Sequence, residues 1–161
     1  MEADSQILDS TEQVVVFSLE EQRYALPLHT VERVLPMVWI SPLPKAPVVV
    51  VGVVNVHGQI LPTLDIRSRF GLPAREWGPD DRLVVVRLSR SSIALPVDEV
   101  LGVFDVDVRE SRTEPWLQSD VRPLSGIVSL PDGLLYLCNL ESFLSLSEEH
   151  QLSAALEKAE P

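Results

Sequence analysis

The side chains of this sequence that could support catalysis or metal binding are few and far apart. The three histidines, His29, His57 and His150, fall in three different segments, without the short spacing that two metal ligands on one element require. The sequence contains no glycine-rich phosphate loop, and none of its serines lies in a Gly-x-Ser-x-Gly turn. This pattern favours surface or turn histidines over a metal site, and it predicts no cofactor.

Asp65 is the carboxylate whose setting most invites comparison with an enzyme. Two small β halves with one aspartate each describe aspartic proteases, in which two carboxylates from Asp-Thr/Ser-Gly turns share a proton. Here Asp65 is followed by Ile66 and Arg67, and its counterpart in the second half of the chain is Asn139, or Leu140 if the gap is placed differently. The dyad cannot form. We therefore expect no catalysis, and we expect Asp65 to cap the turn at Arg67 or to pair with a neighbouring arginine.

Two further sets of reactive or charged side chains are expected to be structural. Cys138 is the single cysteine and lies in an apolar run, which predicts a buried, inert thiol and excludes an internal disulfide. Arg67 and Arg69 are expected to form surface ion pairs with Asp98 and Glu99, and such pairs contribute little to stability.

The charge balance excludes several classes of partner. The 161 residues include 13 basic and 24 acidic side chains, for a net charge of −11. Nucleic-acid binders neutralise phosphates with clustered basic residues, and no such cluster occurs here, so neither nucleic acid nor an anionic membrane is an expected partner. The longest apolar run, residues 47–54, is far shorter than the roughly 20 residues that span a bilayer. The acidic N-terminus lacks the basic and apolar regions of a signal peptide, so we expect a cytoplasmic protein.

The segments that must position these residues occur as two similar copies in the sequence. A shift of 69 residues places residues 15–19 on residues 84–88 and residues 25–27 on residues 94–96. Further along, a shift of 74 residues places residues 52–54 on residues 126–128 and residues 64–66 on residues 138–140. The chain is therefore predicted to be an internal duplication.

Short strands are expected in each half, because apolar runs rich in valine are bounded by turn residues. Pro27 and Pro96 cannot donate to a strand ladder, so each is placed at an edge or a bulge. The expected strands are residues 14–19, 23–28, 48–54, 59–66, 126–130 and 134–140, with residues 31–35 as a further turn or strand. Residues 67–70 are predicted to form one helical turn, an Asp132–Gly133 turn is predicted to join the last two strands, and residues 110–123 are predicted to form a loop.

This pattern predicts a mainly β fold with two small antiparallel barrels. The first barrel is expected over residues 14–72 and the second over residues 83–144, within a domain of residues 13–145. Residues 1–12 are expected to be disordered, and residues 146–161 are expected to form a C-terminal helix and tail.

The segment of residues 52–66 is the most informative for function. Two apolar runs are joined by Asn55-Val56-His57-Gly58, a polar turn that must be presented at a surface. Nothing in it is arranged for bond-making chemistry, so it is predicted to be a recognition edge. Trp39, beside the proline-rich connector of residues 42–47, could anchor an interface or fill a loop.

The order of these motifs resembles the CheW-type coupling proteins of bacterial chemosensory arrays. The resemblance covers roughly residues 14–144. It rests on the following succession: Val-Phe-Ser-Leu (16–19), Tyr-Ala-Leu-Pro (24–27), Val31-x-x-Val34, Pro42-x-Pro44-x-x-Pro47, and Asn55-x-His57-Gly58-x-x-x-Pro62-x-x-Asp65.

This resemblance implies two intertwined five-stranded SH3-like barrels that act as a non-enzymatic scaffold. The implied partners are the cytoplasmic tip of a methyl-accepting chemoreceptor and the regulatory domain of a CheA-type histidine kinase. Carried over by position, the protein-binding residues on the receptor face are Val31, Asn55, His57 and Gly58, with Glu32 and Arg33 beside them.

Two positions depart from the family pattern. The family usually has arginine where this chain has His57, and often an acidic residue where this chain has Arg33. Arginine presents a permanently charged planar fork, whereas histidine is smaller and largely neutral at pH 7. Position 57 is therefore expected to set the identity of the partner. The alternative function is that of a CheW-like regulatory or decoy module in a non-motility signalling system.

Overall fold

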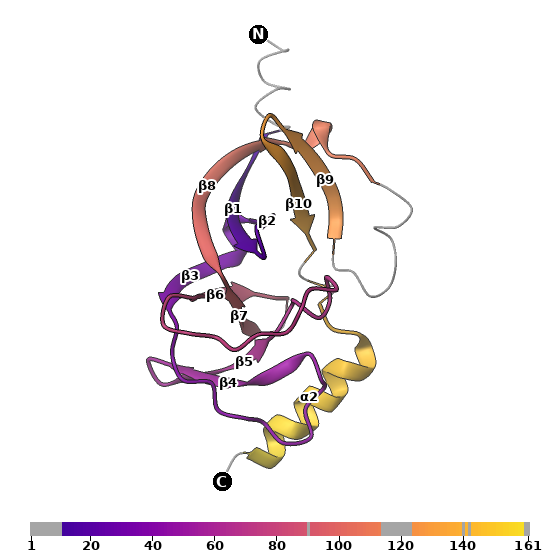
Figure 1. Cartoon of the computed structure of the whole chain (residues 1–161). Coiled ribbons are helices and arrows are strands. Elements are labelled where there is room, and N and C mark those ends of the chain that lie inside the picture. The colour runs from indigo at the N-terminus through magenta and orange to yellow at the C-terminus, as the bar shows by residue number, and fades with distance from the viewer. Residues whose placement is uncertain (1–10, 90, 114–123, 140, 142, 160–161) are drawn as a thin grey trace.

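The described part of the chain contains ten strands and one long helix, and Figure 1 shows them as two stacked lobes with the helix against one of them. The computed structural model describes residues 11–89, 91–113, 124–139, 141 and 143–159. The first five strands are β1 (Thr11–Leu19), β2 (Gln22–Pro27), β3 (Val31–Pro36), β4 (Val50–Val56) and β5 (Gln59–Leu64). The next five are β6 (Arg82–Arg87), β7 (Ser92–Val97), β8 (Glu99–Asp107), β9 (Leu124–Leu130) and β10 (Gly133–Cys138). Two 3-10 turns, η1 (Leu28–Thr30) and η2 (Val108–Glu110), and the helix α2 (Leu146–Ala159) complete the fold.

The strands form two five-stranded sheets with the same internal plan. Sheet A has the order β8-β1-β2-β10-β9, and sheet B has the order β3-β6-β7-β5-β4. The repeat places β1 to β5 on β6 to β10. When each strand of sheet A is replaced by its counterpart in the repeat, the strand order of sheet B results. The mainly β fold with two duplicated, intertwined five-stranded units and a C-terminal helix is confirmed.

The two sheets do not follow the two halves of the sequence. Sheet A combines the first two strands of the first half, β1 and β2, with the last three of the second half, β8 to β10. Sheet B combines β6 and β7 with β3 to β5, so the last three strands of each half are exchanged between lobes. Sheet B is built from residues 31–97 without interruption, and sheet A from strands on either side of that stretch. The expected division into residues 14–72 and 83–144 is therefore wrong as a division into lobes. A repeat reveals which strands are equivalent, but it does not reveal which copy supplies each strand.

Several local expectations also change. Thr11 and Glu12, expected to be disordered, are the first residues of β1, and the rest of that segment lies outside the described residues. The second hairpin turns at Pro131 and Asp132, while Gly133 already belongs to β10. Of the expected loop over residues 110–123, the part from residue 114 onward lies outside the described residues.

Each sheet contains one parallel seam, the pair of neighbouring strands that run in the same direction. In sheet A the seam joins β2 to β10 through three registered pairs, the last of which is Leu137 with Ala25. In sheet B the seam joins β5 to β7 through one pair, Thr63 with Ala94. The repeat places Ala25 on Ala94 and Thr63 on Leu137, so these two pairs are equivalent. The seam of sheet B therefore lacks counterparts of the two pairs that precede Leu137–Ala25 in sheet A.

Pro27 and Pro96 lie on inner strands, so the expectation of an edge position is wrong for the sheet order. Each proline nevertheless lies beyond the last registered pair of its seam, two residues after Ala25 or Ala94. The missing N–H therefore removes no donor from either parallel ladder.

In each sheet a single β-bridge connects the segment that follows one outer strand to the outer strand at the other end of the strand order. Beyond β3, Ser41 pairs with Val53 of β4, and beyond β8, Arg112 pairs with Ile127 of β9. The first bridge requires glycine at position 52, because a Cβ there would lie 2.2 Å from the carbonyl oxygen of Ser41.

Three apolar clusters hold the lobes together. One fills the interior of sheet A and another the interior of sheet B. The largest contains side chains of both sheets and of α2, among them Phe17, Tyr24, Ile93 and Leu152, so it forms the core between the lobes. Because this core is shared, the two sheets hold their outer strands at a fixed relative orientation.

Candidate protein-binding site

Val31, Glu32 and Arg33 begin β3, which is an outer strand of sheet B and pairs with β6. Val31 is half-buried against the inter-lobe core, whereas Glu32 and Arg33 are exposed. The Glu32 carboxylate accepts a hydrogen bond from the Ser92 hydroxyl at 2.7 Å. Arg33 forms no ion pair with any described residue, so its guanidinium is available to an external carboxylate.

Asn55, His57 and Gly58 form the tip of the β4–β5 hairpin. The Asn55 side-chain oxygen accepts a hydrogen bond from the Gly58 N–H at 2.8 Å, which holds the two-residue turn. His57 and Gly58 have φ angles of 51° and 88°, the combination that matches the twist of the flanking strands in a tight hairpin. All three residues are exposed, so the predicted surface turn is confirmed as a structure.

The structure does not join these two groups of predicted residues. β3 and β4 lie at opposite ends of the strand order in sheet B, and no hydrogen bond or ion pair among the described residues connects β3 with the β4–β5 turn. Beyond β3, however, Ser41 pairs with Val53 of β4, so the strand order does not separate the two groups in space. Whether these positions bind a protein remains a prediction.

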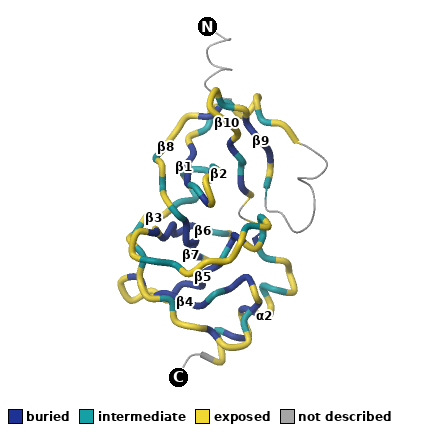
Figure 2. The backbone as a smooth tube through the Cα atoms, viewed as in Figure 1, coloured by how far each residue is buried: buried dark blue, intermediate teal, exposed yellow. Residues whose placement is uncertain are grey.

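Exposed apolar side chains on β8 belong to the same kind of surface and escaped the sequence reasoning. Leu101, Val103 and Phe104 are 40%, 51% and 49% exposed on this outer strand of sheet A, whose alternation of exposed and half-buried residues Figure 2 shows. The repeat places Val103 on Val34, which is also 41% exposed on β3. The same strand position is thus apolar and exposed in both lobes.

A groove of about 660 Å³ connects the two outer strands where the lobes meet. Val34 of β3 and Val100 of β8 contribute apolar lining, and Asp98 and Glu99 make much of the remainder acidic. Trp39, on the connector beyond β3, is 81% exposed. Exposed aromatic and branched side chains beside an open strand edge are typical of protein contact surfaces.

Arg67 lies beneath this surface and fixes the junction between the lobes. Its side chain is 0% exposed, so the expected surface ion pair is wrong. The guanidinium donates to Glu20 in the β1–β2 turn at 2.5 Å and to Asp98 between β7 and β8 at 2.6 Å. Its Nη1 also donates to the Pro73 carbonyl oxygen at 3.1 Å. One buried cation thus links the turn of one sheet to the crossover between both.

A second arginine extends this network to the surface. Arg75 donates to both Asp81 and Asp98, and the Trp77 ring lies 5.2 Å from the Arg67 guanidinium and 4.8 Å from that of Arg75. The Arg75 hydrogen bonds hold the pKa of Asp81 below its ordinary value. Burial raises the pKa of Asp98, but hydrogen bonds from Glu20 N–H and the two guanidinium groups outweigh it, so that pKa is also lowered.

The remaining chemically capable residues have structural settings. Asp65 accepts a hydrogen bond from the Arg67 N–H at 3.0 Å, which confirms the predicted cap. Cys138 is buried as predicted, and burial raises the pKa of its thiol. No group of three His, Cys, Asp or Glu side chains within the described residues could hold a metal ion. No helix in the described part of the chain is long and apolar enough to cross a membrane. Trp116 lies outside the described residues.

Comparisons with known proteins agree with this architecture. The family model of the CheW-like domain matches residues 13–148. The chain is 26% identical over 141 residues to the chemotaxis protein CheW of Rhizobium meliloti, covering 86% of this chain and 90% of the relative. It is also 26% identical over 133 residues to CheW of Helicobacter pylori, covering 82% and 81%.

A solved structure supports the same assignment. The crystal structure of the scaffolding protein TtCheW from Thermoanaerobacter tengcongensis matches with a TM-score of 0.75 and 27% sequence identity, covering 85% of this chain and 90% of that chain. With a family match over most of the chain and the same fold in a solved relative, this chain belongs to the CheW-like domain family.

Proposed function

We propose that the chain is a non-enzymatic scaffold that couples chemoreceptors to a CheA-type histidine kinase. Its partners are the cytoplasmic tip of a methyl-accepting receptor and the regulatory domain of the kinase, so it works in the cytoplasm, beside membrane receptor arrays or within cytoplasmic arrays. Relatives named as chemotaxis proteins and as a scaffolding protein support this role.

The observation that carries the proposal is the pair of equivalent outer strands on two rigidly joined lobes. β3 and β8 each present exposed apolar side chains at matching positions, Val34 and Val103. The shared core and the buried Arg67 network hold the two strands at a fixed angle. A scaffold needs two such contact surfaces in one rigid body, and it needs no reactive group. Individual contacts of this kind are small and gain strength through multivalency in an array.

Glutamate substitutions on each outer strand test the proposal. Binding of the purified chain to the kinase regulatory domain and to a receptor-tip fragment is measured by calorimetry for Val34→Glu, Val103→Glu and the wild type. We expect each substitution to weaken at least one partner by about tenfold or more, because a charge is then desolvated in an apolar contact.

Val48→Glu is the matched control, because Val48 is 97% exposed on a connector away from β3 and β8. It should bind both partners as the wild type does, and unfolding midpoints should agree among all variants. Wild-type chain that binds neither partner, or strand variants with unchanged affinity for both, would show the proposal to be wrong.

The departures at Arg33 and His57 favour one alternative function. Arg33 is exposed and unpaired among the described residues, and His57 occupies the tip of the hairpin turn. If these residues reject a standard receptor, the chain is a regulatory or decoy module in a non-motility signalling system. Such a module binds the kinase domain but not the receptor fragment, and His57→Arg should then increase receptor binding. Unchanged receptor affinity in His57→Arg would show that position 57 does not set the partner.

A further inference from the structure

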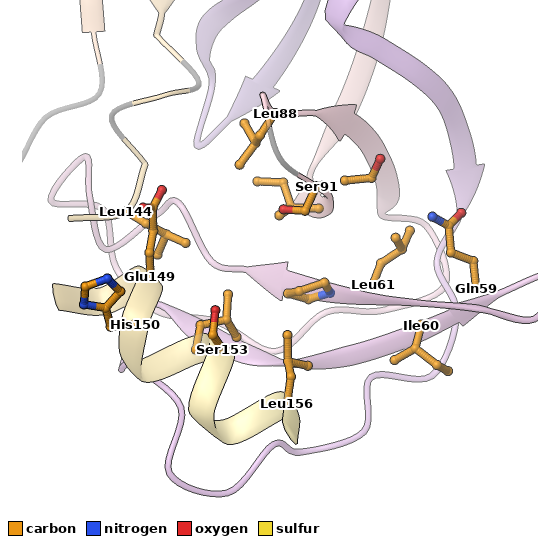
Figure 3. Close-up of a pocket in the computed structure, with 14 residues that line it drawn as sticks. Gln59, Ile60, Leu61, Leu88, Ser91, Leu144, Glu149, His150, Ser153 and Leu156 are labelled. Carbon is orange, nitrogen blue, oxygen red and sulfur yellow. The ribbon is translucent and has the colours of Figure 1, made fainter. Parts of the chain in front are cut away.

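A groove lies between α2 and sheet B, and none of the six predicted binding residues lines it. It has a volume of about 480 Å³, within the range of sites that enclose small ligands or a few side chains. Figure 3 shows Ser153 and Leu156 of α2 on one side, Leu88 and Ser91 of the β6–β7 turn opposite, and Ile60 on β5. The groove therefore lies over the parallel seam of sheet B.

The equivalent position over the seam of sheet A is filled by aromatic rings. The Tyr24 ring lies 4.4 Å from the Phe70 ring and 5.5 Å from the Tyr136 ring, and both pairs are stacked. Tyr24 comes from β2, Tyr136 from β10, and Phe70 from the turn that follows β5. Three rings thus cover the seam of sheet A and fill the space above it.

The repeat replaces all three rings by smaller side chains in the other lobe. The shift of 69 residues places Tyr24 on Ile93, and the shift of 74 residues places Tyr136 on Pro62 and Phe70 on Leu144. Each of these three counterparts lines the groove. The groove is therefore the space that an aromatic stack occupies in the equivalent lobe.

Pro62 also explains why the strands separate beneath the groove. The registered pairing of β5 with β7 contains Thr63 and Ala94 but not Pro62 and Ile93, whereas the equivalent pair Tyr136–Tyr24 is registered in sheet A. Proline has no N–H to donate to a ladder. The seam thus opens at the groove, which leaves space at its base.

The charged and polar residues at the rim of the groove indicate which side chain of a bound partner should lie next to an aromatic ring. Glu149 and His150 of α2 line the groove, and Glu149 forms no ion pair with a described residue. Gln59, Ser91 and Ser153 offer neutral polar groups. Among the described residues no lysine or arginine lines the groove, Arg90 of the β6–β7 turn lies outside them, and the whole chain carries a net charge of −11. A basic side chain next to the aromatic ring would complement this rim.

We propose that the groove between α2, β5 and the β6–β7 turn binds a segment of a partner protein through an aromatic side chain flanked by a basic residue. The ring takes the position that Phe70 has above Tyr24, and the basic group meets Glu149. This surface is a third contact beyond the two outer strands, and it does not depend on the identity of the receptor or the kinase.

Short peptides test the chemistry directly. The methyl signals of Ile60, Ile93, Leu144 and Leu156 are followed by NMR during titration of the full chain with acetyl-Lys-Phe-Lys-amide. The peptides acetyl-Lys-Leu-Lys-amide and acetyl-Glu-Phe-Glu-amide serve for comparison. We expect the first peptide to shift these methyl signals and to bind about fivefold more tightly than either of the others.

A substitution that places an aromatic ring of the chain itself in the groove should prevent the peptide from binding. Leu144→Phe supplies the ring that Phe70 supplies in the other lobe, so it should remove the methyl shifts and raise the unfolding temperature. Leu146→Phe is the matched control, because Leu146, two residues further along at the start of α2, is 66% exposed and is not part of the groove lining. It should leave peptide binding unchanged.

A second variant keeps the proposal testable if Leu144→Phe does not fold. Ser153→Trp places a ring in the groove from an exposed helix position and should also block the peptide. The proposal is overturned if no groove methyl shifts, if the phenylalanine and leucine peptides bind equally, or if Ser153→Trp binds the peptide as the wild type does.

Discussion

The turn that follows β5 and the turn that follows β10 have equivalent positions but different contacts. Both begin with the same cap, since Asp65 accepts from Arg67 N–H at 3.0 Å and Asn139 accepts from Glu141 N–H at 3.2 Å. Two residues after the cap, the first turn places a fully buried arginine between the lobes. The second turn places Glu141 at the surface.

The partners of these two residues are also counterparts in the repeat. Arg67 binds Glu20 in the β1–β2 turn, and Glu141 accepts hydrogen bonds from Ser89 in the β6–β7 turn at 3.1 and 3.2 Å. The first contact is a partly buried, charge-assisted bond of an arginine that has further partners, whereas the second contact is exposed. Both copies therefore retain the same backbone turn, but only the first copy carries a buried arginine that joins the two lobes through ion pairs.

Among the four variants below, the one that removes the buried arginine should lose the most unfolding free energy. In Arg67→Met, Glu20 and Asp98 lose their shared cation, and the expected loss of unfolding free energy is about 3 kcal/mol. That value is the lower end of the range for a broken buried pair, because Asp98 keeps Arg75 and Glu20 is 42% exposed. Urea unfolding measures it. Arg109→Ala, which breaks an exposed pair with Asp107, should leave the stability close to that of the wild type. Equal losses in both variants would contradict the assigned role of Arg67.

Asp98→Asn should have the next largest effect and should depend on pH. At pH 7 the variant loses charge-assisted bonds to two guanidinium groups, which costs about 1.5–3 kcal/mol. The pKa of Asp98 in the folded chain lies below its ordinary value of 3.8, so its contribution is present above pH 3.8 and is lost as pH falls through the folded pKa.

Stability curves at several pH values therefore check the sign of this effect. The difference between wild type and Asp98→Asn should be constant near neutral pH and should shrink below pH 3.8. A difference that grows on acidification would mean that Asp98 is not held as a carboxylate by the arginines.

Phe70→Leu should make the seam of sheet A resemble that of sheet B. The substitution removes a ring stacked 4.4 Å from Tyr24, and it should cost about 1–2 kcal/mol through lost packing. Thermal unfolding measures the loss, with Val48→Ala as an exposed control that should change little. If Phe70→Leu is as stable as the control, the aromatic stack does not distinguish the two lobes.

Glu141→Gln should have the smallest effect of the four. Its contacts with Ser89 are exposed, so the expected loss is below about 1 kcal/mol in urea unfolding. A loss as large as that of Arg67→Met would show that both junctions are locked equally and would remove the contrast between the two turns.

Much of this comparison follows from patterns that are local in the sequence. The repeat identified the equivalent strands, and the caps at Asp65 and the turn at Asn55 follow from residue types within three positions of one another. The repeat also pairs Val103 with Val34, but the exposure of both depends on the outer positions of β8 and β3 in the sheets.

The burial of Arg67 could not be predicted from the sequence. Its partners Glu20 and Asp98 lie 47 and 31 residues away, and an arginine beside a turn is ordinarily solvated. Only the exchange of strands between lobes brings the β1–β2 turn and the β7–β8 crossover to the same point. The expectation of a surface pair failed for this reason.

The sequence by itself determined that the chain is a duplicated β protein with short strands, a glycine-dependent hairpin turn at His57–Gly58 and a terminal helix. These features depend on hydrophobic period and backbone preference, which act over a few residues. The tertiary structure alone decided that β3 to β5 and β8 to β10 are exchanged between lobes, that the Arg67 side chain is fully buried where the lobes meet, and that Pro62, Ile93 and Leu144 leave a groove where the other lobe has three rings. Each of these depends on which distant strands meet, and either copy of an element can satisfy the same local pattern.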